Sequence, residues 1–524
     1  MSLQTDVKVF LLNSPSIVSS HTKYTVHHGI PPIGLAYIAG ALKKINMPFK
    51  LLDAVGENLK RHVRYNNEKD LYLRGLSDEE VIAAIPPSVK YIGISSMYVV
   101  DWLQVRNLVK KIKIKLPDVI IVIGGENATS FWKKILEFEN NIDFIIVGEG
   151  DEIFPDLIQT LESNGNISDI SGLAYRQATG VPKLNERRAR IKNLDDFKPD
   201  WEQFPLQNYF NEKTMVRSVG KSSMPIVASR GCVYKCSFCT SENKWGTTFV
   251  TRPVESVVAE FREYYEKYKI EHICIVDLAA SIDHRWFMSL VKALANEQLP
   301  ISWELSSGTR SEFLSRENLQ LMLKSNFTYL TLAPDSGSKK TLELIHKKLD
   351  LEKFEQAIID VIDLKMRVKT NFIVGMEGQS NYQIWETYMA AIKYAWQGVD
   401  DIAIYPYVPY PGSKMFDQMV SKGLIKLDTP EEYEEYIKKA ATFSIVAVNN
   451  PNLEYSALLT SIHIYVMIIC FIISLVVKPK RLFVLIKRLH ARKAVGVFEV
   501  AIYQCYDWNR IMMKILFSKW SKVN

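Results

Sequence analysis

Three cysteines lie within one run of eight residues, at Cys232, Cys236 and Cys239. The chain of 524 residues has six cysteines in all, so half of its thiols are placed on one short stretch. Thiolate sulfur is the ligand that iron–sulfur clusters prefer. Three cysteines leave one iron of a four-iron cluster without a protein ligand, and that iron can bind and reduce a small molecule. The C-x3-C-x2-C spacing therefore predicts a [4Fe–4S] cluster with an open iron.

Two other uses of these cysteines are less favoured. A structural zinc ion needs a fourth Cys or His ligand, and the nearest candidates, His272 and Cys274, do not follow at the spacing of a zinc finger. A disulfide cannot use three thiols evenly, and six cysteines in a chain of this length are not the framework of a small secreted protein. An oxygen-sensitive cluster and unpaired cysteines together predict a cytoplasmic location.

The aromatic residue before the last cysteine, Phe238, completes a motif that resembles the cluster loop of the radical S-adenosylmethionine (SAM) superfamily. The resemblance implies that the open iron binds the amino and carboxylate groups of SAM. An electron, from a donor such as flavodoxin or ferredoxin, then cleaves SAM to a 5′-deoxyadenosyl radical.

Later segments carry further resemblance to this superfamily. The run 333–338 (APDSGS) resembles a Gly-x-Glu-Ser-Gly-Ser motif with an aspartate in place of the glutamate, and the run 371–378 resembles the strand that flanks the SAM adenine. An arginine at the end of a predicted strand could bind the SAM carboxylate, and a surface ion pair is an equal alternative for it. The residues assigned to SAM are Phe238, Arg310, Asp335, Ser336, Ile373 and Gly375.

The first 160 residues alternate short apolar runs with helical patterns, which predicts a doubly wound, Rossmann-like parallel sheet. The expected strands are 8–12, 49–53, 91–95, 119–123 and 142–147. Such sheets bind ligands at the carboxyl ends of their strands. Serines and glycines gather at those ends here, so we expect a ligand site at this edge.

The spacing at this edge resembles the second half of the cobalamin-binding signature, with a Ser-x-Met at 95–97 and a Gly-Gly at 124–125. In the first half of that signature, Val55 stands where a histidine would ligate cobalt. The resemblance therefore implies bound cobalamin without a lower His ligand, as in the cobalamin-dependent branch of the radical SAM superfamily. A degenerate domain that binds nothing is the alternative. The residues assigned to cobalamin are Ser95, Ser96, Met97, Gly124, Gly125, Gly148, Glu149 and Gly150.

A turn-rich stretch, 161–222, is expected to link the two domains, with the basic run 187–190 as a solvated face. Over 223–440 the alternation of strand and helix resumes, and its six strands predict the (β/α)6 partial TIM barrel that the superfamily resemblance implies. Chemistry in such barrels lies at the C-terminal ends of the strands. Three tyrosines near the end of the sixth strand are therefore substrate-binding candidates: Tyr405, Tyr407 and Tyr410.

The last part of the chain, 441–524, is predicted to be a helical extension. Its segment 458–477 is almost wholly apolar and is followed by basic residues. Three interpretations stay open: a membrane span, whose length fits but whose polar residues weaken it, a helix on the membrane surface with its basic flank on anionic headgroups, or a helix packed on the barrel or on a second copy. The second would make the protein peripheral at the inner face of the membrane.

The net charge of +7 is modest, and no basic stripe is evident, so nucleic acid is not an expected partner. The resemblance implies a cobalamin-dependent radical SAM enzyme that methylates an unactivated carbon of a small molecule. The apolar, basic-flanked tail favours a lipid or isoprenoid substrate. The alternatives are an oxidative cyclase or other rearrangement that uses the same cofactors without methyl transfer, and a non-catalytic sensor that binds cobalamin or the cluster.

Overall fold

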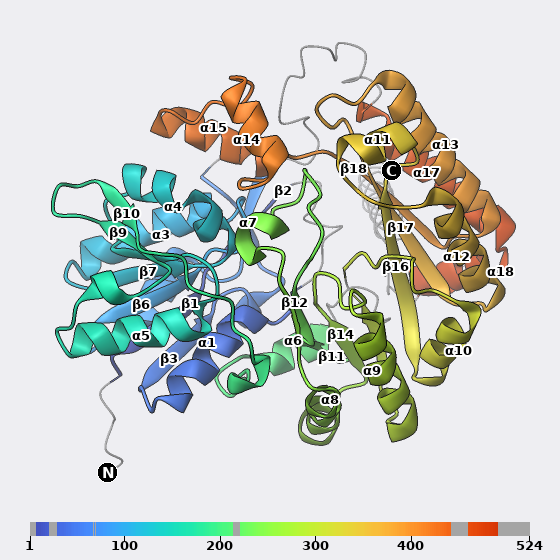
Figure 1. The fold of residues 1–524 in the computed structure, drawn as a ribbon. Coiled ribbons are helices and arrows are strands. Elements are labelled where there is room, and N and C mark those ends of the chain that lie inside the picture. Colours follow the sequence, from blue (N-terminus) through green and yellow to red (C-terminus); the bar gives the residue numbers. More distant parts are fainter. Residues whose placement is uncertain are drawn as a thin grey trace, which may run out of the picture.

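The computed structural model describes residues 7–19, 29–66, 68, 70–212, 221–305, 307–441 and 460–490. These residues form two large sheets with helices packed on them, and the two sheets lie on opposite sides of the molecule (Figure 1). Between the sheets lie β12 (Ser229–Gly231) and α7 (Ser241–Trp245), which flank the cysteine loop. The predicted α/β architecture, a doubly wound sheet followed by a six-stranded partial barrel, is confirmed.

The first sheet has seven strands in the order β10-β9-β8-β7-β6-β1-β3. Its five predicted strands are present and parallel: β1 (Val9–Asn13), β3 (Phe49–Asp53), β6 (Tyr91–Ser95), β7 (Ile120–Gly124) and β8 (Phe144–Ile146). Two antiparallel strands extend its edge, β9 (Leu173–Arg176) and β10 (Pro182–Leu184). The prediction missed these two because they are short and lie among turn residues. A small separate sheet joins β2 (Ser16–Ser19), β5 (Leu71–Arg74) and β4 (His62–Arg64).

Helices cover both faces of this sheet because its strands are apolar on both sides. In β1, Val9 and Leu11 share one core with α1 (Ile33–Lys44) and α5 (Gly150–Glu162). The alternate residues, Phe10 and Leu12, share another core with α3 (Trp102–Lys115) and α4 (Glu126–Phe138), and α2 (Asp78–Ala84) contacts α3. Because successive side chains of a strand point to opposite faces, each strand packs against both helical layers.

The second sheet has six parallel strands in the order β11-β14-β15-β16-β17-β18. They are β11 (Ser223–Ile226), β14 (His272–Ile275), β15 (Ser302–Leu305), β16 (Phe327–Asp335), β17 (Arg367–Val374) and β18 (Asp401–Pro406). The helices that follow the strands are α8 (Val254–Tyr268), α9 (His284–Glu297), α10 (Arg316–Lys324), α11 (Lys339–Leu344), α12 (Leu351–Asp363) and α13 (Asn381–Gln397). A sheet in this order is open between its two edge strands, as a partial barrel requires.

Two helices after the sixth strand return to the first sheet. They are α14 (Lys414–Ser421) and α15 (Pro430–Ala441), and their apolar side chains share a core with α3 and α4. Phe131 of α4 meets Tyr433 edge to face, with ring centroids 5.0 Å apart. An ion pair from Arg106 to Glu434, 2.6 Å long, closes the same contact. The chain after the barrel therefore helps to fix the position of the first sheet against the second.

The basic run 187–190 is not the solvated face that was predicted. Arg188 pairs with Glu152 and Asp156 of α5, at 2.9 and 2.6 Å. Arg190 pairs with Glu149 at 2.7 Å and is largely buried. The prediction was wrong because composition alone does not show that acidic residues of α5 lie opposite this run.

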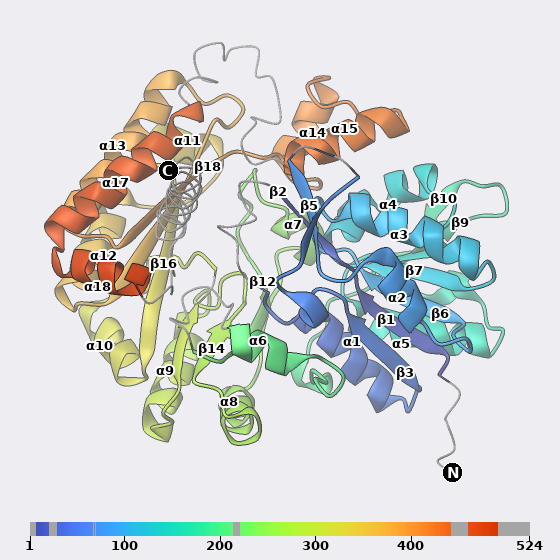
Figure 2. The same ribbon diagram turned by 180° about the vertical axis from the view of Figure 1, so that it is seen from behind.

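The described part of the tail packs on the barrel. After residue 459 the chain forms α17 (His463–Val477), which lies along α13 and the edge strand β18 (Figure 2), and then α18 (Lys480–His490). The backbone N–H of Ile404 in β18 donates to the sulfur of Met467 at 3.2 Å. In the ranges described, no helix is both long and apolar enough to cross a membrane. Residues 458 and 459 of the predicted apolar segment lie outside the described residues.

Candidate active site

The cysteine loop runs from β12 to α7 and is held by backbone hydrogen bonds. The N–H of Ser237 donates to the carbonyl of Ile345 at 3.0 Å, and the N–H of Met415 donates to the carbonyl of Ser237 at 2.9 Å. Within the loop, the N–H of Cys239 donates to the carbonyl of Cys236 at 3.0 Å. The loop is therefore fixed at its middle to the chain that follows β16 and to the start of α14.

The three thiols are free and half-buried. Burial raises the pKa of Cys236 to about 11 and also raises the pKa of Cys239, whose sulfur accepts a hydrogen bond from the N–H of Ser241 at 3.5 Å. Metal binding by thiols releases protons, so raised pKa values are those of ligands that stay neutral until iron arrives. Over the described residues, no three His, Cys, Asp or Glu side chains already converge on one metal position.

Charged residues from the barrel surround the loop. The guanidinium of Arg310 lies 3.8 Å from the ring centroid of Tyr234 within the loop, and its Nε donates to Glu312 at 2.9 Å. Asp335, at the end of β16, has a positive φ of 63° and forms an ion pair with Lys347. Lys347 and Tyr234 were not predicted, because Lys347 belongs to no motif and Tyr234 occupies an unspecified position between the first two cysteines.

The other predicted SAM residues lie around the same strand ends. Phe238 packs against the core that joins the loop to the first sheet. The hydroxyl oxygen of Ser336 lies 2.8 Å from that of Thr387 in α13. Gly375, just after β17, has a φ of 80° and its N–H donates to Gln379 at 2.8 Å. The structure thus brings the predicted SAM residues to one end of the barrel, and their contact with SAM stays a prediction.

Along β17, half-buried residues alternate with fully buried ones. The half-buried residues lie on the inner face of the strand, which is therefore less tightly packed than the outer face. Ile373 pairs in register with Tyr405 of β18. The Nζ of Lys369 donates to the Tyr405 hydroxyl at 3.3 Å. Tyr405 is 44% exposed, which fits a substrate-binding residue. Lys369 could have been found from its period-two spacing with Ile373 along the strand.

The other two predicted tyrosines differ in exposure. Tyr407 is buried in the core that includes α4 and α14, and burial raises its pKa well above the ordinary value. Tyr410 is 44% exposed. Of the three predicted substrate residues, Tyr405 and Tyr410 are therefore the accessible ones.

The predicted cobalamin edge of the first sheet is formed by close backbone contacts. The N–H of Ser96 donates to the carbonyl of Gly124 at 2.7 Å, and Asn127 donates to the Ser96 hydroxyl at 3.0 Å. A Cβ added to Gly125, whose φ is 107°, would lie 2.6 Å from the carbonyl oxygen of Ser96. Met97, beyond this contact, is exposed. At Gly125 the two backbone segments therefore lie too close together for any residue other than glycine.

We expect Gly125→Ala to destabilise the first sheet, since a methyl group there clashes with fixed backbone and strains a positive φ. The strain alone should lower the free energy of unfolding by about 1–3 kcal/mol. Denaturant unfolding and retention of added cobalamin measure the effect. Gly34→Ala in α1 is the matched control, because its Cβ would meet no atom within 4 Å. Equal losses in both variants would contradict this account of the edge.

The segment that carries the cobalt-ligating histidine in the cobalamin signature has no such ligand here. Asp53 accepts hydrogen bonds from the hydroxyl of Tyr209 at 2.6 Å, from Asn13 at 2.7 Å and from the N–H of Gly56 at 3.0 Å. Val55 packs with Tyr209 in a small apolar cluster. Tyr209, from α6 (Leu206–Glu212), was not predicted, because nothing in the sequence links α6 to the end of β3.

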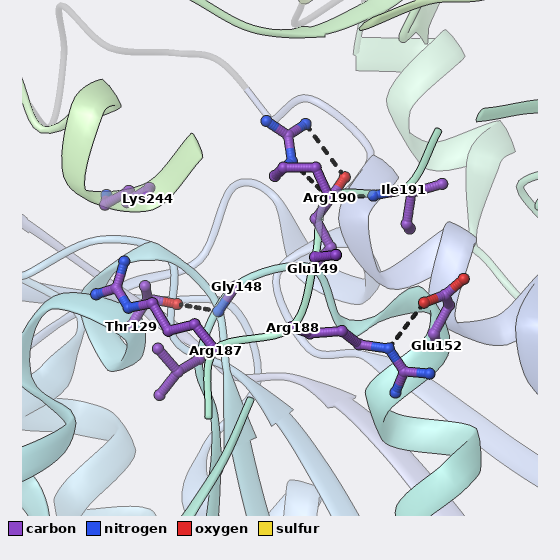
Figure 3. Close-up of a pocket in the computed structure, with 11 residues that line it drawn as sticks. Thr129, Gly148, Glu149, Glu152, Arg187, Arg188, Arg190, Ile191 and Lys244 are labelled. Carbon is purple, nitrogen blue, oxygen red and sulfur yellow. Dashed lines mark hydrogen bonds and ion pairs between the residues drawn. The ribbon is translucent and has the colours of Figure 1, made fainter. Parts of the chain in front are cut away.

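A buried ion network joins this edge to the cysteine loop. Glu149 accepts from the Nε of Arg190 at 2.7 Å and from the N–H of Ile191 at 3.1 Å (Figure 3). Arg230 of β12, two residues before the first cysteine, donates to Glu149 at 3.1 Å and to both oxygens of Asp151 at 2.9 Å. These carboxylates hold the pKa of Arg230 above its usual range. Glu149, predicted to bind cobalamin, is already occupied as a bridge between the domains.

A cavity of about 30 Å³ adjoins this network (Figure 3). It lies between the end of β8, the run 187–191 and Lys244 of α7. Gly148 opens onto it, and its N–H donates to the hydroxyl of Thr129 at 3.1 Å. That volume holds about one or two waters, so the cavity is a gap at the domain contact and not a cofactor pocket.

The two halves of the chain match two protein families. Residues 23–158 match the B12 binding domain, and residues 226–391 match the Radical SAM superfamily. The first span contains β3, β6, β7 and β8 of the first sheet, and the second contains the cysteine loop and most of the barrel. The chain therefore carries a B12-binding domain followed by a radical SAM domain, and the resemblance predicted from the sequence is confirmed.

Three known proteins show what this chain is similar to. It is similar to the cytidylyl-2-hydroxyethylphosphonate methyltransferase of Streptomyces wedmorensis, at 28% identity over 458 residues, which cover 81% of this chain and 83% of that protein. It is similar to the anaerobic magnesium-protoporphyrin IX monomethyl ester cyclase of Cereibacter sphaeroides, at 24% identity over 74% of this chain and 60% of the cyclase. The fold resembles that of the radical SAM methyltransferase TsrM of Kitasatospora setae, solved with cobalamin and a [4Fe–4S] cluster, with a TM-score of 0.61 and 14% identity over 79% of this chain and 74% of TsrM.

The residues present fit the cofactors that these domains imply, which are SAM, a [4Fe–4S] cluster and cobalamin. Three free sulfur donors on one loop match the ligand preference of iron. At the cobalamin edge, a Cβ at Gly124 would meet only Ile146, at 3.8 Å, so the backbone there is not covered by another residue.

Proposed function

We propose that the protein is a cobalamin-dependent radical SAM C-methyltransferase. The observation that supports this most strongly is the bond from Arg230 to Glu149 and Asp151, which fixes the start of the cysteine loop against the carboxyl edge of the B12-binding sheet. A methyl group carried at that edge and a radical formed at the loop must meet at one substrate carbon. Fixing the two edges together supplies the proximity that such a reaction needs.

When bound, SAM and the cluster supply a radical that removes hydrogen from carbon, and cobalamin supplies the methyl group. Cys232, Cys236 and Cys239 would hold the cluster. Asp335 is positioned at a strand end beside the loop to accept a hydrogen bond from SAM, with Lys347 fixing its orientation. The guanidinium of Arg310, stacked on the loop, would bind the SAM carboxylate.

The first domain would hold cobalamin along its glycine-lined edge, with Ser96 and Gly125 shaping the surface. At the position where the signature has the histidine, Val55 packs with Tyr209, and neither side chain offers a nitrogen to cobalt. The substrate would enter the inner side of the barrel, where Lys369 and Tyr405 can orient a polar group. We propose a small-molecule substrate with an apolar portion, of lipid or isoprenoid type, and an external one-electron donor such as flavodoxin or ferredoxin.

A ring-forming oxidative cyclase is the second candidate, favoured by the similarity to the Cereibacter sphaeroides cyclase. The two candidates differ in their products from SAM. A methyltransferase with cobalamin forms S-adenosylhomocysteine and 5′-deoxyadenosine together, whereas a cyclase forms no S-adenosylhomocysteine.

We expect reconstituted protein, with a reductant and an extract from cells lacking its gene as the substrate source, to form both products in about equal amounts, one of each per methyl transferred. Liquid chromatography with mass spectrometry measures them. 5′-Deoxyadenosine alone, rising with extract, would favour the cyclase. Neither product in the presence of intact cluster and cobalamin would favour a non-catalytic sensor.

A further inference from the structure

The outer face of α17 is apolar throughout. The helix contains no Asp, Glu, Lys or Arg. Its inner side, which includes His463, Val466, Cys470 and Ile473, is buried against the barrel. Six of its large apolar side chains are exposed: Ile464, Tyr465, Ile468, Ile469, Ile472 and Val476. A solvent-facing helix normally carries charge on this side, so this face is built to contact something other than water.

The two neighbouring helices extend this face. On α13, which packs along α17, Tyr382, Trp385, Met389 and Trp396 are exposed. On α18, Leu482, Phe483, Val484 and Ile486 are exposed. Figures 1 and 2 show the three helices together on the outer side of the barrel. About half of the exposed large apolar side chains in the described ranges lie on these three helices, and an apolar patch of this kind marks an interaction site.

The charges that the tail places beside this face are positive. No Asp or Glu occurs between Glu454 and Glu499, whereas seven Lys and Arg residues lie in that interval. Lys480 and Lys487 of α18 are exposed beside Phe483. Other cations of this interval stabilise the packing: Lys478 pairs with Asp400 at 3.0 Å. Exposed lysines on α18, together with the exposed isoleucines of α17 and tryptophans of α13, match the headgroup and acyl layers of an anionic bilayer surface.

We propose that the exposed apolar faces of α13, α17 and α18 form a docking surface for an anionic lipid bilayer. A second copy of the chain is a poorer occupant, since a symmetric contact would bring the same cations together. The surface begins at the barrel mouth: a Cβ at Gly375 would lie 2.7 Å from the hydroxyl of Thr460, just before α17. Docking would therefore hold the mouth beside the lipid layer. The proposal concerns location and is independent of the reaction that the site performs.

Flotation of the full-length, reconstituted protein with vesicles tests this. We expect it to float with vesicles of phosphatidylcholine and phosphatidylglycerol, and less with phosphatidylcholine alone. The double variant Ile472→Glu with Phe483→Glu should lower binding about tenfold or more, because it places carboxylates in the apolar contact. Lys480→Glu with Lys487→Glu should remove the preference for phosphatidylglycerol.

The matched control is Ile114→Glu with Val181→Glu, which adds the same charge at exposed apolar residues of the first domain, 83% and 55% exposed. It should float like the wild type. Unfolding curves and iron content, unchanged in every variant, show that the fold is retained. The proposal is overturned if the wild type binds neither vesicle, or if the Ile472→Glu/Phe483→Glu variant binds like the wild type. It is also overturned if sedimentation shows a dimer that this variant splits while no vesicle binding occurs.

Discussion

Cys239→Ala should reduce the reductive cleavage of SAM by at least about a hundredfold, because the loss of one of three thiolates leaves the cluster without a stable site. Burial raises the pKa of Cys239, and the N–H of Ser241 donates a hydrogen bond to its sulfur. Among the described residues no spare cysteine lies nearby, since Cys274 and Cys470 are buried in the barrel and in α17. Iron content and 5′-deoxyadenosine, measured after anaerobic reconstitution, report the loss.

Cys470→Ala is the control for this variant. It removes a buried thiol of the same kind from α17, away from the loop, and should keep iron and SAM cleavage near the wild-type level. Unfolding curves separate loss of the cluster from loss of the fold. If Cys239→Ala retained its iron and cleaved SAM like the control, these three cysteines would not be the cluster ligands.

Arg230→Ala should have the second largest effect, since it leaves buried Asp151 without its cation and removes one of the two arginines that pair with Glu149. Removing one partner of a buried ion pair costs about 3–5 kcal/mol of folding free energy. Arg230 also lies over the ring of Tyr37 in α1, 4.8 Å from its centroid, so the change weakens the contact of β12 with the first domain. We expect methyl transfer to fall more than SAM cleavage, because only methyl transfer needs both domains in register.

Arg188→Ala is the matched control for Arg230→Ala. Arg188 pairs with Glu152 and Asp156 within the first domain, and all three side chains are partly exposed. Such a pair is worth about 0–1 kcal/mol, so both activities should persist. Arg230→Lys should recover part of the lost methyl transfer, since it restores the charge without the two-pronged geometry. Equal losses of methyl transfer and SAM cleavage in Arg230→Ala would contradict a role in joining the domains.

Much of the fold could be predicted because its signals are local. The five parallel strands of the first sheet are runs such as 91–95 and 120–124, which are apolar because they are buried on both faces. The doubly wound sheet and the partial barrel followed from the alternation of strands with helices. The edge strands β9 and β10 gave no such signal, since each is short and neither is apolar on both sides.

The site was predictable where a motif is continuous in sequence and unpredictable where it depends on the domain contact. The cysteine loop and the glycines at 124–125 are local patterns. Arg230 lies two residues from Cys232, but its partners Glu149 and Asp151 come from the other domain, and no periodicity reveals such a pair. Tyr209, which donates to Asp53, was also missed because its partner is distant in sequence. The wrong prediction that 187–190 is a solvated face has the same cause.

Metal analysis of the anaerobically reconstituted full-length chain, after gel filtration with SAM and cobalamin, tests most directly whether one polypeptide holds both cofactors. The account predicts about four irons and about one cobalt per chain, one corrin for each B12-binding domain, in the same peak. A peak that carries iron without cobalt would contradict the role given to the first domain. A peak without iron would contradict the cluster, and with it the proposed reaction.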